Sequence, residues 1–231
     1  MKKILLLAFT ASVMLGACKK SDDTPKEEVC TTVSSYSTSY DYSPDTHVKN
    51  ISYDSQNRIS KVTWSNSSLT YTYSASSITE DVNDGGYLEQ TVYTLDDKNR
   101  IVREVRGTDV DISYFYDAEG HLSEVNDGSE TTTFEWQNGN LVECDGTTYS
   151  YYNEVAPQSY LITTYGVNGI YLNSSLYSYF GKMSKNLLKT ETEGQSTTTY
   201  QYEKDTKGRV NKITSINGGD KDTYAISYSC D

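Results

Sequence analysis

The sequence is poor in proline and in histidine, and it lacks the short motifs of common hydrolases. Only three prolines occur among 231 residues, so β-strands can run without interruption. The two histidines, His47 and His121, argue against a catalytic dyad or a histidine-based metal site. The Gly-x-Ser-x-Gly, His-Glu-x-x-His and Cys-x-x-Cys motifs are missing. We therefore expect no cofactor and no metal, and we favour a non-catalytic role over an enzyme.

Long hydrophobic runs are also missing, apart from one at the start of the chain. Residues 4–15 form an apolar stretch that follows Lys2 and Lys3 and is too short to cross a bilayer as a helix. The string Leu-Gly-Ala-Cys then ends at Cys18 and resembles a bacterial lipobox. In such signals the cysteine becomes the lipid-bearing N-terminus. We therefore predict a signal peptide at 1–17 and a lipid anchor on Cys18.

The segment after Cys18 is polar and charged. Residues 19–28 read Lys-Lys-Ser-Asp-Asp-Thr-Pro-Lys-Glu-Glu, a composition that indicates a flexible tether, which we place at 18–29. An acidic run after a lipidated cysteine is similar to the surface-export signal of Bacteroidota lipoproteins. This resemblance implies a lipid-anchored protein of the outer membrane, exposed on the cell surface or otherwise on the periplasmic face.

The charge of the chain limits its partners. The formal net charge is −12, and an acidic surface repels nucleic acid and anionic lipid. We expect no nucleic-acid partner, and we expect membrane contact through the lipid anchor only. Solubility alone is a sufficient explanation of the acidity.

Three cysteines remain besides Cys18, namely Cys30, Cys144 and Cys230. An envelope compartment is oxidising, so a disulfide is permitted. Because Cys30 opens the folded part and Cys230 nearly closes it, a bridge between them would tie the first strand to the last. The alternative is two unbridged thiols. We expect Cys144 to be packed rather than reactive.

Tyrosine is abundant, with 22 copies, and it alternates with polar residues. In residues 110–116, for example, Val110, Ile112, Tyr114 and Tyr116 fall on one face of an extended chain. This period of two indicates strands with one buried face. Tyrosine suits such a surface because its ring packs while its hydroxyl reaches water or a neighbour. Residues 30–231 are therefore predicted to form a single all-β domain.

A short phrase recurs along this domain: an aromatic residue, a polar turn with Asn or Gly, Arg or a similar residue, and an aliphatic strand. It is found at 53–59, 96–101, 114–122, 134–141 and 200–210. The spacing predicts one hairpin per about 21 residues, and hence a large antiparallel β-meander of about 15–17 strands, curled or barrel-like. Residues 160–185 depart from the phrase. We expect there one short helix or packed loop that ends at Gly181 and covers one face of the sheet.

The strands that follow the turns carry aliphatic pairs three residues apart. Ile59 with Val62, and Leu122 with Val125, are examples. An odd separation sends two side chains to opposite faces of a regular strand. Either a β-bulge lies between them, or the sheet buries part of both faces. We favour the second explanation because a sheet of this length is expected to curl on itself.

The phrase resembles a known repeat. The pattern Tyr-x-Tyr-Asp-x-x-Gly-Arg-Leu is that of the tyrosine-aspartate (YD) repeat of Rhs-type and teneurin-type proteins. It is matched by Tyr114, Tyr116, Asp117, Gly120 and Leu122, with His121 where Arg is usual. The lipobox, the tyrosine-rich meander and residues 179–187 also resemble a family of Bacteroidota lipoproteins of unknown function with a porin-like fold. These resemblances imply a meander rolled toward a barrel, and they imply no activity.

The alternation makes a membrane-spanning barrel improbable, because tyrosine alternates with Ser, Thr, Asp or Lys rather than with lipid-facing apolar residues. Trp64 and Trp136, the only tryptophans, are candidates for an aromatic platform that binds sugar rings, although core packing is the commoner role. Our first hypothesis is a non-catalytic binding or scaffold module with a glycan or protein ligand. The alternatives are a surface polysaccharide hydrolase and a structural accessory subunit of an envelope complex.

Overall fold

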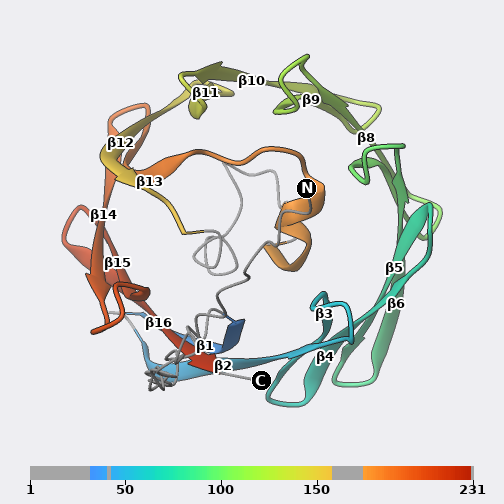
Figure 1. The fold of residues 1–231 in the computed structure, drawn as a ribbon, viewed down its shortest axis with the longest axis horizontal. Coiled ribbons are helices and arrows are strands. Elements are labelled where there is room, and N and C mark those ends of the chain that lie inside the picture. The colour runs from blue at the N-terminus through green and yellow to red at the C-terminus, as the bar shows by residue number, and fades with distance from the viewer. Residues whose placement is uncertain (1–31, 41–42, 158–173, 230–231) are drawn as a thin grey trace, which may run out of the picture.

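The computed structural model describes residues 32–40, 43–157 and 174–229. Within them, sixteen antiparallel strands form one closed barrel, in which consecutive strands pair and β16 pairs back with β1 (Figure 1). This confirms the predicted all-β meander and its strand number, and it shows that the sheet closes. The strands are β1 (Thr32–Tyr40), β2 (Ser43–Tyr53), β3 (Ile59–Trp64), β4 (Ser67–Tyr73), β5 (Ser77–Asp84), β6 (Tyr87–Leu95), β7 (Ile101–Arg106), β8 (Val110–Tyr116), β9 (Leu122–Asn126), β10 (Thr131–Gln137), β11 (Asn140–Cys144), β12 (Thr147–Val155), β13 (Asn186–Glu193), β14 (Ser196–Lys204), β15 (Val210–Asn217) and β16 (Asp220–Ser229).

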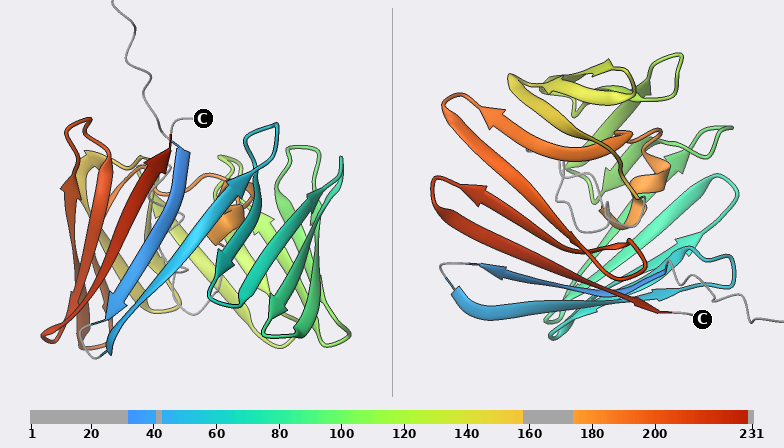
Figure 2. Two further views of the ribbon diagram at one scale, coloured as in Figure 1. Left: turned by 90° about the horizontal axis from the view of Figure 1, so that it is seen from below. Right: turned by 60° about the vertical axis from the view of Figure 1, so that its left-hand side comes forward.

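The turns form two rims. The connections that follow even-numbered strands lie at the same end of the barrel as the start of β1 and the end of β16 (Figure 2). We call this end the terminal rim. The turns that follow odd-numbered strands form the far rim.

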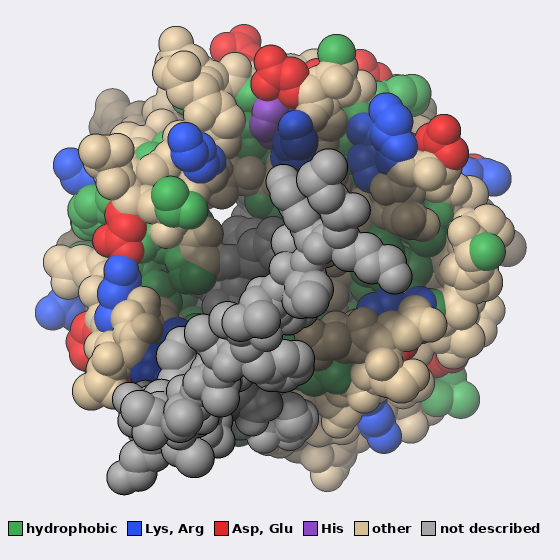
Figure 3. Space-filling view, viewed as in Figure 1, with side chains coloured by type: hydrophobic (Ala, Val, Ile, Leu, Met, Phe, Trp, Pro, Cys, Tyr) green, Lys and Arg blue, Asp and Glu red, His purple; other side chains and the backbone are tan. Residues whose placement is uncertain are grey.

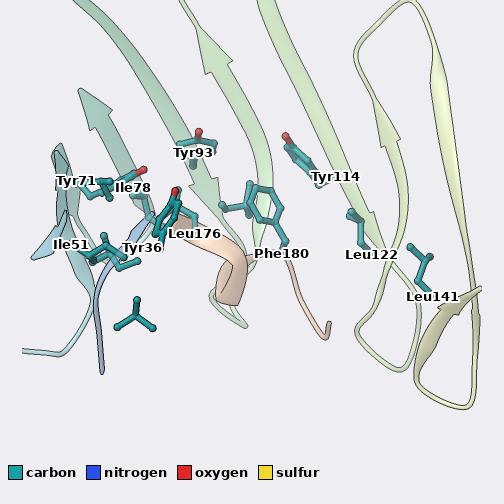
Figure 4. Packing of buried hydrophobic residues seen from close by; sticks show 14 of the residues in the cluster. Tyr36, Ile51, Tyr71, Ile78, Tyr93, Tyr114, Leu122, Leu141, Leu176 and Phe180 are labelled. Atoms are coloured by element: carbon teal, nitrogen blue, oxygen red, sulfur yellow. The ribbon is translucent and has the colours of Figure 1, made fainter. Parts of the chain in front are cut away.

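The two faces of the wall differ in polarity. The buried rings of Tyr71, Tyr93 and Tyr114 point into the lumen, toward Leu176 and Phe180 (Figure 4). Alternate positions on the same strands face outward, and most of them are polar. They include Ser68, Thr70, Thr72, Asp81, Gln90, Arg103, Asp111, Thr133, Glu135, Thr148, Thr190, Thr192, Thr197, Glu203, Lys212 and Thr223. The barrel therefore keeps most of its aromatic residues inside, with Phe115 as an outward exception, and presents mainly hydroxyls and charges outside.

The recurring phrase of the sequence builds one structural unit at the terminal rim. In the turn after β2, Asp54 accepts hydrogen bonds from the backbone N–H groups of Gln56 and Arg58, both at 2.9 Å, and from Arg58 Nε at 2.7 Å. The Arg58 guanidinium then lies 4.0 Å from the ring centroid of Tyr73. The Tyr73 hydroxyl donates to the Ile59 carbonyl at 2.6 Å. Thus the aspartate orders the turn, the arginine covers the ring, and the ring hydroxyl binds the start of the next strand.

Three further turns repeat this arrangement. The second and fourth copies use arginine and tyrosine, and the third replaces them with histidine and tryptophan. These three units are Asp96–Arg100–Tyr116, Asp117–His121–Trp136 and Asp205–Arg209–Tyr228.

β-Bulges explain the aliphatic pairs that are three residues apart. Between β2 and β3, Ser52 pairs with Lys61 but Tyr53 pairs with Ile59, so Ser60 is an extra residue. Equivalent shifts occur between β8 and β9 and between β14 and β15. Ile59 and Val62 consequently face the same side, and both are buried. The expectation that both faces of the sheet are buried was wrong, and the bulge is the correct explanation.

A 3-10 helix, η2 (Ser174–Tyr179), lies inside the ring of strands (Figure 1). Its Leu176 and the following Phe180 are almost fully buried. The short helix expected within 160–185 is therefore present, although 158–173 lie outside the described residues. Gly181 follows with a φ of 81°, which suits a residue that ends a helix. In the described part of the chain, no helix is long and apolar enough to cross a membrane.

Candidate functional site

The barrel wall opens between β11 and β12 at the terminal rim. These strands share two paired positions close to the far rim, Glu143 with Thr148 and Cys144 with Thr147. Because β12 continues to Val155, most of its length has no ladder partner on the β11 side. The chain that follows η2 enters the wall at this gap.

Residues 180–186, here called the strap, close the gap. Their backbone is hydrogen-bonded to two rim turns: the Lys182 N–H donates to the Gly120 carbonyl, and the Lys185 N–H donates to the Gly139 carbonyl, both at 2.9 Å. The Lys185 carbonyl accepts from the Ala156 N–H at 2.9 Å, at the end of β12. These bonds attach the strap to the β8–β9 turn, to the β10–β11 turn and to the end of β12. The strap is therefore an integral part of the rim.

Side chains join the strap to β11 and β12. Asn140 and Asn186 are paired reciprocally, with Asn140 Nδ2 donating to Asn186 Oδ1 at 3.1 Å and the Asn186 N–H donating to Asn140 Oδ1 at 2.9 Å. Ser184 Oγ accepts from the Leu141 N–H at 3.2 Å and is hydrogen-bonded to the Tyr151 hydroxyl at 2.9 Å. Both sides of the gap are thus held together through the strap.

A cleft of 560 Å³ lies between the strap and the rim. Its walls come from the β8–β9 turn (Glu119, His121), the β10–β11 turn (Gly139), the end of β12 (Val155, Ala156), η2 (Tyr177, Ser178) and strap residues 181–185. Its volume is in the range of small-molecule sites. Figure 3 looks onto the terminal rim and shows a hollowed face surrounded by basic and acidic side chains. This cleft is the candidate functional site.

His121 forms a fixed aromatic wall of the cleft. Its side chain is buried, its ring stacks on Trp136 with centroids 4.5 Å apart, and its Nδ1 lies 3.1 Å from Asp117 Oδ2. Burial acts to raise the pKa of Asp117, but hydrogen bonds from His121 and Gly120 outweigh it and lower that pKa below its ordinary value. Because Asp117 stays ionised, it holds the imidazole edge while Trp136 holds the ring face.

The cleft is richer in cations than in carboxylates. Exposed Lys182 and Lys185 stand against a single exposed carboxylate, Glu119, among the described lining residues. Arg100 Nη1 and Lys182 Cε each lie 3.9 Å from the place that a Cβ on Gly120 would take, but the Arg100 guanidinium is already paired with Asp96 at 2.7 Å. Lys182 and Lys185 are therefore the cations that the described lining offers to a ligand. Their charge favours an anionic ligand.

The two tryptophans lie apart in the barrel wall. Trp136 on β10 is half-buried behind His121, and its Nε1 donates to the Leu122 carbonyl at 2.7 Å. Trp64 on β3 is half-buried too, with Lys49 Nζ 5.2 Å from its ring centroid. Both pack against the core. Trp136 thus supports the cleft from behind, and direct sugar stacking on either indole stays a prediction.

Of the predicted cysteine sites, Cys18, Cys30 and Cys230 lie outside the described residues. Thr32 pairs with Ser229, so the strand ends that flank Cys30 and Cys230 are neighbours. The lipid anchor and the disulfide stay predictions. Cys144 has no exposed surface, as expected for a packed residue.

Sequence reasoning did not single out Lys182, Lys185 or the role of His121 as a cleft wall. The one signal was the failure of the repeated phrase in 160–185, which coincides with η2 and the strap. The spacing of residues along the chain could not place the strap against the turns at Gly120 and Gly139, because those contacts join residues 46 to 62 positions apart.

No protein-family model matches the chain, and no curated protein matches it in sequence. Among solved structures, the fold is similar to that of a porin-like protein from Bacteroides uniformis, with a TM-score of 0.64 and 16% identity. The similarity covers 87% of this chain and 99% of that chain. At this identity the similarity concerns the fold, and it agrees with the porin-like barrel that the sequence resemblance implied.

Proposed function

We propose that the protein is a non-catalytic binding module that takes an acidic saccharide in the rim cleft. The observation that carries the proposal is the combination, in one cleft of 560 Å³, of a tyrosine ring, hydroxyl groups and two exposed lysines. Tyr177 offers ring surface to a sugar face. Ser178 and Ser184 offer hydroxyls to sugar hydroxyls, and Lys182 and Lys185 offer charge-assisted hydrogen bonds to a carboxylate or sulfate.

The outer wall favours a barrel that works in water rather than a pore. Outward ion pairs join Arg103 to Asp111 at 2.6 Å and Lys212 to Glu203 at 2.7 Å. A spanning barrel requires an apolar outer band, and charged residues on a lipid face cost about 2–4 kcal/mol at mid-depth. The polar outer wall also explains how a porin-like fold can serve a binding role.

The cleft favours a binder over a hydrolase. Glycoside hydrolysis generally requires two carboxyl groups on either side of the scissile bond. Among the described residues that line the cleft, Glu119 is the one carboxylate, and its side chain is 77% exposed. The described lining therefore lacks the second carboxyl group that this mechanism requires.

We place the binding module at the outer membrane, held by a lipid on Cys18 and exposed at the cell surface. The YD-like phrase is, in this proposal, a folding element that builds the rim. The start of β1 lies on the terminal rim, the end of the barrel that also carries the cleft. A ligand held there would be close to the anchored end of the domain.

A glycan array tests the proposal. The protein without residues 1–17, carrying Cys18→Ala, is screened against uronic-acid, sulfated and neutral glycans. We expect acidic glycans to bind and Lys182→Ala/Lys185→Ala to weaken their binding at least about tenfold, since each charge-assisted contact contributes about 1.5–3 kcal/mol. The matched control is Lys98→Ala/Lys207→Ala, which removes the same charge from terminal-rim turns outside the cleft. Equal loss in both variants, or no glycan bound at all, contradicts the proposal.

A further inference from the structure

The hairpin of β5 and β6 has an open edge at the far rim. Its two strands pair with each other from Asp84–Tyr87 to Ser77–Thr94. Pairing of β6 with β7 begins only at Thr91–Arg106. Residues 87–90 therefore have a strand partner on one side only. The β5–β6 hairpin splays out beyond the ring of strands at this place (Figure 1).

The backbone of this edge is oriented to bind another strand. Gly85 and Gly86 form the two-residue turn, with φ values of 59° and 102°, which fit a type I′ hairpin. In such a hairpin the flanking pair, here Asp84 and Tyr87, exchanges the first hydrogen bonds. Because the ladder alternates, the N–H and C=O groups of Leu88 and Gln90 then point to the open side. An open edge of this kind is a template for an added strand.

A cleft of 450 Å³ occupies the place where β7 would continue. Its lining takes residues from both faces of β6: Leu88, Gln90 and Val92 from the outer face, and Tyr87 and Glu89 from the inner one. Gly107, where β7 has ended, closes it. A cleft lined by both faces of a strand lies in the plane of the sheet, which is where an added strand would lie.

The edge exposes apolar side chains on both of its faces, Leu88 on the outer face and Tyr87 on the inner one. Leu88 is 74% exposed and Tyr87 is 62% exposed. Val92 and Val105 are directly paired across β6 and β7 and line the same cleft. Exposed apolar side chains that alternate with open backbone groups are the features by which sheet edges recognise extended peptides.

We propose that this edge binds an extended, basic peptide segment of another protein as an additional strand beside β6. Glu89 lines the cleft, and Asp84 and Asp109 lie on the two hairpins that bound it. Arg106 Nη1 lies 4.0 Å from Glu89, and its Nη2 lies 3.9 Å from Glu104. A basic segment complements these carboxylates. A second copy of this chain fits less well because each copy carries a net charge of −12.

The test uses the whole protein without residues 1–17 and a synthetic peptide, acetyl-Lys-Val-Thr-Val-Thr-Lys-amide. We expect binding by NMR titration, with the Leu88 and Gln90 amides slowed in hydrogen exchange. A peptide with an N-methylated backbone should bind at least about tenfold more weakly, because it cannot donate the backbone hydrogen bonds of an added strand. A peptide with Glu in place of Lys should also bind at least about tenfold more weakly, because its charge has the same sign as the carboxylates at the edge. Equal binding of the N-methylated peptide overturns the added-strand geometry, and equal binding of the Glu peptide overturns the choice of a basic partner.

Matched variants locate the site. Leu88→Lys should abolish binding, whereas Phe115→Lys, a change at another exposed outward position of the wall, 49% exposed in the folded chain, should leave it intact. Equal effects of the two would show that the peptide binds elsewhere. If the protein alone dimerises and Leu88→Lys prevents this, the edge belongs to a second copy, and the proposed partner is wrong.

Discussion

Replacing Gly181 by alanine should release the strap while the barrel stays folded. Gly181 has a φ of 81°, where an L-residue is strained by about 1–2 kcal/mol. An added Cβ would also lie 2.5 Å from the Gly120 carbonyl oxygen and 2.8 Å from the Tyr116 ring. Gly120 belongs to the turn that Asp117 orders, and Tyr116 belongs to the unit of Asp96 and Arg100, so neither can move without disturbing an ordered turn. The strap is the part that has to shift.

The expected magnitude follows from the contacts that the shift breaks. Moving the strap breaks the 2.9 Å hydrogen bond from Lys182 to Gly120, a loss of about 1 kcal/mol. It also lifts Phe180, 1% exposed, out of the core, and burying such a side chain contributes about 1.5–3 kcal/mol. The docked strap should therefore lose about 2.5–4 kcal/mol beyond the backbone strain, since the two contributions add.

Gly146→Ala is the control for backbone strain. Gly146 has a φ of 77°, close to that of Gly181, and an added Cβ would meet no atom within 4 Å. Trypsin cleavage after Lys182 and Lys185 reports strap release, because a docked strap resists the protease. We expect cleavage of Gly181→Ala to be faster than that of Gly146→Ala by about two orders of magnitude. Equal rates for the two variants would show that the strap is not held by this contact, and the reasoning would be refuted.

Three further predictions concern the rim and the core. Tyr116→Phe removes the 2.6 Å hydrogen bond to the Ile101 carbonyl and should lower the free energy of unfolding, measured by urea titration, by about 1 kcal/mol. An unchanged urea midpoint would show that this hydrogen bond does not stabilise the fold. The backbone N–H of Arg58, then its side chain, lowers the pKa of Asp54 below the ordinary 3.8. A carboxyl group with a depressed pKa stabilises the fold above pH about 4, and this contribution is lost as the pH falls through the lowered value. In Asp54→Asn the free energy of unfolding should therefore fall less steeply between pH about 4 and lower pH than it does in the unchanged protein. Burial, and then the nearby carboxylates, raise the pKa of the Cys144 thiol to about 12. At pH 8 the Cys144 thiol should therefore be alkylated only as fast as the protein unfolds. Rapid modification of Cys144 in the native protein would contradict its buried position.

The sequence predicted the strands and their approximate number, but it left open whether the sheet closes into a barrel. Alternation in residues such as 110–116 marked the buried row correctly, and the repeated turns led to the right number of strands. The bulges were the main error, because a pair such as Ile59 and Val62 is compatible with two geometries. The choice between them depends on how Tyr53 and Ser52 pair across the ladder, which is a property of two strands together.

The candidate site was located only in outline. The break in the phrase at 160–185 indicated where the chain does something other than extend the meander, and the strap is there. The cleft itself depends on a short β11, which leaves the end of β12 without a ladder partner on the β11 side. Neither the length of that gap nor the meeting of Lys182 with Gly120 follows from periodicity, since both depend on long-range register.

By itself, the sequence determined the local chemistry of this protein. Each Asp-x-x-x-Arg or Asp-x-x-x-His turn contains the groups that order it, and each strand carries its own alternation, because these interactions join residues close in the chain. The tertiary structure alone decided that the ring closes through β1 and β16, that the buried row of tyrosines faces its lumen, and that a cleft at the terminal rim and an open edge at the far rim are left over. Those outcomes depend on the stagger of sixteen strands around a closed ring, in which every register constrains its neighbours.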